Sequence, residues 1–170
     1  DAPTSGAIGQ DPDQTYPSSD DTPVGVQKID YPISGAAFVR WEMVIPGDDD
    51  IDLFLENSAG TIIAASTNGG TDELIELTLP VDDTYTMVVH GWSVPNEPLP
   101  YTLSYWAVPL TPGGGSLSVD SAPASAISGS VGTVDVSWSG LAGGTSYLGA
   151  VSHTGDAGLL GLTLVEVDSP

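Results

Sequence analysis

Apolar and polar residues alternate along most of the chain, in short runs separated by turn residues. Val39 and Trp41 fall on one side of an extended chain, for example, and Arg40 and Glu42 fall on the other. Successive side chains of a β-strand point to opposite faces of a sheet, so this period of two predicts strands. Up to residue 110 the predicted strands are 24–29, 37–45, 51–56, 61–66, 73–79, 84–91 and 101–108, enough for one antiparallel β-sandwich.

The remaining segments divide the chain further. Residues 1–23 lack hydrophobic periodicity, so we expect an acidic linker or arm, with the carboxylates Asp11, Asp13, Asp20 and Asp21. The sandwich then spans 24–110, and residues 111–116 are typical of a Gly-rich linker. Residues 117–170 predict a small β module with strands at 117–119, 132–139, 146–153 and 159–167.

The composition supports this all-β interpretation. A hydrophobic fraction of 40% provides enough apolar side chains for a core, which excludes a disordered acidic tail. The chain also contains 21 Gly and 14 Pro, which disfavour long helices. We therefore expect an antiparallel β-sandwich followed by a small second β-sandwich-like unit.

The charge balance limits the possible partners. The chain has 23 acidic residues against only Lys28 and Arg40, a formal net charge of −21. Binding to nucleic acid or to an anionic membrane requires cationic side chains, so both are excluded as partners. A cation, a neutral polymer, a basic protein surface or a saline medium stays compatible with the charge.

A series of short motifs lies between Gly47 and Trp106. In chain order they are an Asp-rich turn, Asp52-Leu53-Phe54-Leu55, Asn57-Ser58-Ala59-Gly60, the turn 68–73, Thr84-Tyr85-Thr86-Met87-Val88-Val89 and Tyr101-Thr102-Leu103. Together they resemble the bacterial pre-peptidase C-terminal domain, which follows the catalytic domain of secreted peptidases. The segment 115–167, with the pieces 132–141 and 147–152, is similar to the module that ends some bacterial subtilisin-like serine peptidases.

The resemblance implies a non-catalytic pair of β units from a secreted, extracellular protein. Its partner would be the cognate catalytic domain of the same polypeptide. Asp1-Ala2-Pro3 opens the sequence without a basic or apolar leader, which we interpret as the start of an internal fragment. The absence of cysteine means that disulfides give no information on the compartment.

The two histidines are the first candidates for chemistry. His90 falls at the end of a predicted strand, and His153 precedes a Thr-Gly-Asp turn. Neither lies in a subtilisin-type catalytic segment, and the sequence has no Gly-x-Ser-x-Gly elbow. We expect structural histidines and no catalytic residues; two separated histidines without cysteine also disfavour zinc.

Calcium is the one cofactor that the sequence suggests. Asp48, Asp50 and Asp52 form a D-x-D-x-D run at a turn, and calcium prefers several oxygen ligands. The alternative is a solvated Asp-rich turn without a bound ion.

Aromatic residues suggest a substrate-binding surface. Trp92 lies beside a proline-rich loop, and Tyr101 and Tyr105 share one face of the following strand. Exposed flat rings could hold an insoluble protein or a polysaccharide by stacking. The alternative is that most of the aromatic residues, Trp41, Trp106 and Trp138 among them, fill the core.

The preferred function is that of a non-catalytic C-terminal accessory domain of an extracellular subtilisin-like peptidase, aiding stability, secretion or substrate targeting. One alternative is a polymer-binding module for collagen, keratin or polysaccharide. The other is a structural surface or adhesion domain, for which the parent reading frame would contain repeated copies of this unit.

The net charge of −21 predicts that cations stabilise the fold, because they screen the repulsion between carboxylates. The melting temperature should rise as sodium chloride or calcium chloride is added. Calorimetry across both titrations checks this, and a melting temperature that stays flat in both contradicts it.

Overall fold

The computed structural model describes residues 3–19, 21–45, 47–70, 72–111 and 115–170. All regular structure in these residues is β, and every strand pair is antiparallel. The chain divides into two compact units, Asp1–Leu110 and Thr111–Pro170. None of the described residues forms a helix of the length and apolarity that crossing a membrane requires.

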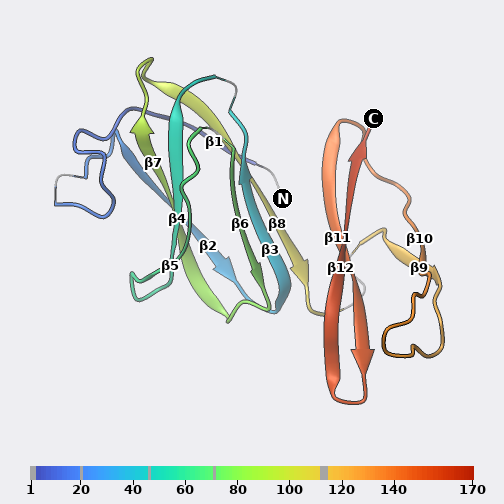
Figure 1. Cartoon of the computed structure of the whole chain (residues 1–170). Helices are drawn as coiled ribbons and strands as arrows, with labels where there is room; N and C mark the ends of the chain where they lie inside the picture. The colour runs from blue at the N-terminus through green and yellow to red at the C-terminus, as the bar shows by residue number, and fades with distance from the viewer. Residues whose placement is uncertain (1–2, 20, 46, 71, 112–114) are drawn as a thin grey trace. The chain divides into compact units, whose positions relative to one another are not determined.

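The first unit is a sandwich of two four-stranded sheets (Figure 1). One sheet, called here the front sheet, has the order β2-β7-β4-β5; the other, the back sheet, has the order β1-β8-β3-β6. The strands are β1 Thr4–Ile8, β2 Val26–Ile33, β3 Ala36–Met43, β4 Asp50–Glu56, β5 Ile62–Ser66, β6 Glu73–Thr78, β7 Asp83–Ser93 and β8 Leu99–Pro109.

The core lies between the two sheets and follows the predicted alternation. On β4, Ile51, Leu53 and Leu55 are completely buried, while the intervening residues point to the outer face of the front sheet. Trp41 of β3 is also completely buried, with its ring 5.6 Å from that of Tyr31 on β2. Burial of each such side chain contributes about 2 kcal/mol, so the two sheets stabilise each other.

A tight hairpin joins β4 to β5, as the sequence predicts. The Asn57 side-chain oxygen accepts the backbone N–H groups of Ala59 at 3.1 Å and of Thr61 at 3.0 Å. Gly60 has a φ of +73°, a left-handed conformation that favours glycine.

The N-terminal segment differs from the acidic linker or arm expected over 1–23. Thr4–Ile8 forms β1 at the edge of the back sheet, paired with β8, and Ile8 is completely buried. Residues 9–19 and 21–25 then run along the front sheet. There Asp11 N–H donates to the Gly91 carbonyl at 2.8 Å, and Gly91 N–H donates to the Gly25 carbonyl at 2.9 Å. The segment is attached through backbone hydrogen bonds, which do not require alternating apolar side chains. Its sequence therefore lacks the periodicity of a strand and predicts a linker.

The second unit consists of two separate two-stranded sheets (Figure 1). β9 Ser118–Ser121 pairs with β10 Asp135–Ser137, and β11 Thr145–Gly155 pairs with β12 Gly158–Ser169. None of its described residues is fully buried, and Trp138, one of the expected core fillers, is 46% exposed. The described part of this unit is thus all-β and antiparallel, with side chains that are at most partly buried.

Replacement of Gly91 by alanine is predicted to destabilise the first unit. A Cβ at this position would lie 2.1 Å from the Gly9 carbonyl oxygen, because the N-terminal segment lies directly on β7. The expected loss is about 1–3 kcal/mol in the free energy of unfolding, measured by chemical denaturation. Gly69→Ala is the matched control, since a Cβ there meets no atom within 4 Å. Equal stability of the two variants would contradict the packing of the segment on β7.

Candidate functional site

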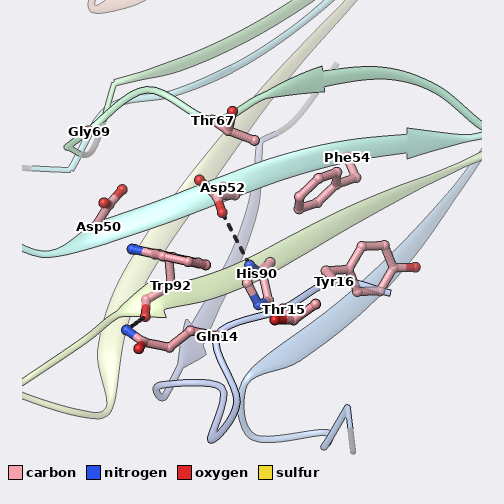
Figure 2. Close-up of a pocket in the computed structure, with 10 residues that line it drawn as sticks. All are labelled: Gln14, Thr15, Tyr16, Asp50, Asp52, Phe54, Thr67, Gly69, His90 and Trp92. Atoms are coloured by element: carbon pink, nitrogen blue, oxygen red, sulfur yellow. Dashed lines mark hydrogen bonds and ion pairs between the residues drawn. The ribbon is translucent and has the colours of Figure 1, made fainter. Parts of the chain in front are cut away.

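A pocket of about 490 Å³ lies on the outer face of the front sheet (Figure 2). Strands β4 and β7, the N-terminal segment and the loop after β5 all contribute to its walls. The lining residues are Gln14, Thr15, Tyr16, Asp50, Asp52, Phe54, Thr67, Gly69, His90 and Trp92.

Strand alternation places the central side chains of the pocket. Asp50, Asp52 and Phe54 occupy every second position of β4, opposite in parity to the three buried core residues of that strand. Asp52 pairs directly with His90 across β4 and β7. Side chains at such cross-strand positions are close neighbours, so the register itself brings a carboxylate to the imidazole.

His90 is held between two carboxylates. Its Nδ1 lies 3.3 Å from Asp52 Oδ2, and its Nε2 lies 3.2 Å from Asp11 Oδ2. His90 is 1% exposed and Asp11 is 0% exposed. Carboxylates only accept hydrogen bonds, so both ring nitrogens have to donate, and an imidazole donates from both nitrogens only when it is protonated.

The surroundings of His90 have opposing effects on its charge. Burial alone would lower the pKa of His90, but the hydrogen bonds and negative charges of Asp52 and Asp11 raise this pKa above its usual value. The N-terminal segment is thereby tied to the front sheet by a buried ion pair. We call Asp11, His90 and Asp52 the histidine clasp.

Asp11 also organises its own loop. Its Oδ2 accepts the Thr15 backbone N–H at 3.3 Å, while its Oδ1 is buried and lacks a hydrogen-bond partner among the described residues. A buried carboxylate in this position is costly unless it has a charged partner. His90 is that partner, so removal of the imidazolium would leave Asp11 uncompensated.

Aromatic rings form a second contact between the segment and the sheet. The Tyr16 ring lies 5.0 Å from Phe54 and 6.0 Å from His90, measured between centroids. The Tyr16 hydroxyl donates to Glu56, which also pairs with Lys28 Nζ at 3.1 Å. Burial and the hydrogen bond to Glu56 raise the pKa of Tyr16, so the hydroxyl keeps its proton.

This geometry suits binding and cohesion better than proton transfer. A histidine general base needs a free ring nitrogen facing a nucleophile or a substrate. Both nitrogens of His90 face carboxylates instead. His153, in the second unit, is exposed, and its Nε2 lies 2.8 Å from Thr163 Oγ1.

The three calcium candidates are not gathered into one ligand set. Asp48 is exposed at the turn, Asp50 Oδ1 accepts the Gly70 N–H at 3.2 Å, and Asp52 belongs to the histidine clasp. Within the described ranges, no group of three or more His, Cys, Asp or Glu residues is placed to hold a metal ion. Calcium binding therefore stays a prediction.

The three aromatic candidates lie in different surroundings. Trp92 is 41% exposed and lines the pocket of the front sheet. Tyr101 of β8 is buried, with its hydroxyl donating to Gln27 Oε1 at 2.7 Å. Tyr105 of β8 is half-buried, with its ring 4.6 Å from that of Tyr31. They do not form the common surface expected from the sequence, and only Trp92 remains at a candidate site.

Sequence reasoning missed the contribution of the N-terminal segment. Asp11, Gln14 and Tyr16 reach the front sheet from a stretch without strand periodicity, and 79 positions separate Asp11 from His90. The sequence of β4 contains one signal that this face of the sheet is covered. Asp52 and Phe54 share the parity of exposed positions, and a phenylalanine there indicates that something covers this face.

The fold and the site together define an antiparallel β-sandwich whose N-terminal segment is clasped onto one face. No known family model and no curated protein sequence matches the chain.

The histidine clasp predicts a pH-dependent stability. Because the folded-state pKa of His90 is raised, its contribution is fully present below the unfolded value of about 6.5 and is lost as the pH rises through the folded value. His90→Gln should cost on the order of 3 kcal/mol at pH 6 and should flatten the decline in stability above that pH. Unfolding titrations measure both effects. His153→Gln, at the exposed histidine, should reproduce the wild-type profile; a wild-type profile in His90→Gln contradicts the clasp.

Proposed function

We propose that the chain is a non-catalytic accessory region of an extracellular subtilisin-like peptidase, and that it aids the stability, secretion or substrate targeting of the catalytic domain. The motifs between residues 47 and 106 support this proposal, since they resemble the pre-peptidase C-terminal domain. The sandwich of two four-stranded sheets is the kind of architecture that this resemblance implies.

The histidine clasp is the observation that carries the proposal. The imidazole of His90 is 1% exposed, and its two nitrogens are engaged with Asp11 and Asp52. A group in this state contributes to cohesion rather than to bond breaking. The histidine clasp therefore supports a role as a stable accessory domain attached to another domain.

The distribution of charge supports an extracellular, saline setting. Both cations of the chain are engaged: Lys28 pairs with Glu56 at 3.1 Å, and Arg40 pairs with Glu76 at 2.7 Å. Most carboxylates therefore have no cationic side chain to pair with. Dissolved cations have to moderate their repulsion, and a saline medium supplies them.

The structure gives less support to a polymer-binding surface made of Trp92, Tyr101 and Tyr105. Tyr101 is buried and Tyr105 packs against the ring of Tyr31, so neither extends the exposed ring of Trp92 into a flat platform. Tyr101 and Tyr105 therefore add no area to what Trp92 offers for stacking on a polymer. The accessory role is therefore preferred.

Two measurements test the proposal. The isolated chain should release no product from casein or from small peptide esters above the buffer rate, because both ring nitrogens of its buried histidine, His90, face carboxylates. In the parent protein, deletion of this region should lower the yield of secreted peptidase or its retention on insoluble substrate, while kcat on a small soluble peptide stays unchanged. Turnover by the isolated chain, or a parent reading frame without a peptidase domain, would overturn the proposal.

A further inference from the structure

The pocket of the front sheet has acceptor groups that the fold leaves unused. One carboxylate oxygen of Asp50 accepts a hydrogen bond from the Gly70 N–H, and one carboxylate oxygen of Asp52 accepts a hydrogen bond from His90 Nδ1. Within the described part of the chain, the second oxygen of each carboxylate accepts no hydrogen bond. The Asp52 side chain is only 10% exposed, so its free oxygen is a nearly buried acceptor that lines a pocket.

Aromatic rings stand beside these carboxylates. Figure 2 shows Trp92 on the same side of β4 and β7 as Asp50, Asp52 and His90. Trp92 makes an edge contact with His90, with 6.4 Å between ring centroids, and the residue is 41% exposed. Gln14 Nε2 donates to the Trp92 backbone carbonyl at 2.7 Å and so fixes the base of this wall.

The charge of the pocket selects the sign of a ligand. Asp11 and Asp52 flank a single imidazole, and Asp50 lines the same pocket, so these groups together stay net negative with His90 protonated. Carboxylates beside an aromatic face attract cations, through charge and through the ring quadrupole. Anionic ligands are repelled for the same reason.

The shape of the pocket favours a guanidinium over a metal ion. A metal ion would use only the oxygens, whereas a guanidinium stacks flat on an indole and donates to carboxylates at its edge. A volume of about 490 Å³ accommodates a whole arginine side chain. The chain itself supplies no occupant, because Lys28 is engaged with Glu56 and Arg40 with Glu76.

We propose that this pocket binds the guanidinium group of an arginine side chain on a basic segment of a partner protein. Asp50 and Asp52 accept hydrogen bonds from the guanidinium, and Trp92 stacks on its plane. The site goes beyond the accessory role proposed above, and it exists whether or not a peptidase domain precedes this chain.

The test is a titration of the 170-residue chain with the capped peptide Gly-Arg-Gly, followed by NMR. The indole N–H signal of Trp92, assigned by its loss in Trp92→Ala, should shift with a dissociation constant in the millimolar range, as expected for one exposed side-chain anchor. The same peptide with citrulline in place of arginine keeps the shape and loses the charge, and it should not shift this signal.

Matched variants separate the pocket from general acidity. Trp92→Ala should weaken binding on the order of tenfold, and Asp50→Asn severalfold, both measured by calorimetry with an arginine-rich peptide. Trp138→Ala and Asp156→Asn change an exposed tryptophan and an exposed aspartate of the second unit, and they should bind as the wild type does. Equal binding of the citrulline peptide, or equal losses in the control variants, would overturn the proposal. Neither outcome bears on the accessory role.

Discussion

The buried ion pair between His90 and the two carboxylates of Asp11 and Asp52 is the constraint that holds the N-terminal segment on the front sheet. A charge out of contact with water is stable only with an opposite charge and hydrogen bonds at close range. The imidazolium supplies both to Asp11, and Asp11 therefore has to stay on β7. The rest of the N-terminal segment follows, because its backbone hydrogen-bonds to Gly91 on the same strand.

This attachment changes what the front sheet presents to solvent. Without the segment, Phe54 and the imidazole would lie on an open sheet face, whereas Tyr16 now packs against both. Covering a sheet face also adds apolar burial beyond that of the two-layer core. The same segment supplies Gln14 and Thr15 to the pocket, so a cation site on this face depends on the clasp that holds its wall in place.

The sequence predicted those parts of the fold that alternation determines. The alternation along β4 places Ile51 on the core face and Asp52 on the outer face, as the structure does. Asn57 indicates the hairpin that follows this strand. It could not predict the clasp, because pairing between Asp11 and His90 depends on a backbone path that no local pattern encodes. Aromatic residues misled for a related reason, since the parity shared by Tyr101 and Tyr105 does not tell which face of the strand is buried.

Native-state hydrogen exchange of the Asp11 and Gly91 amides tests the central claim most directly. The Asp11 N–H donates to the Gly91 carbonyl at 2.8 Å, across the junction between segment and sheet, and the Gly91 N–H donates to the Gly25 carbonyl at 2.9 Å, where the chain enters β2. If the clasp holds the segment as part of the sandwich, these amides exchange only when the first unit unfolds, at the same rate as the amide of Val89 in β7. Exchange of Asp11 at the rate of an unprotected loop would show that the segment is a free arm and that the account is wrong.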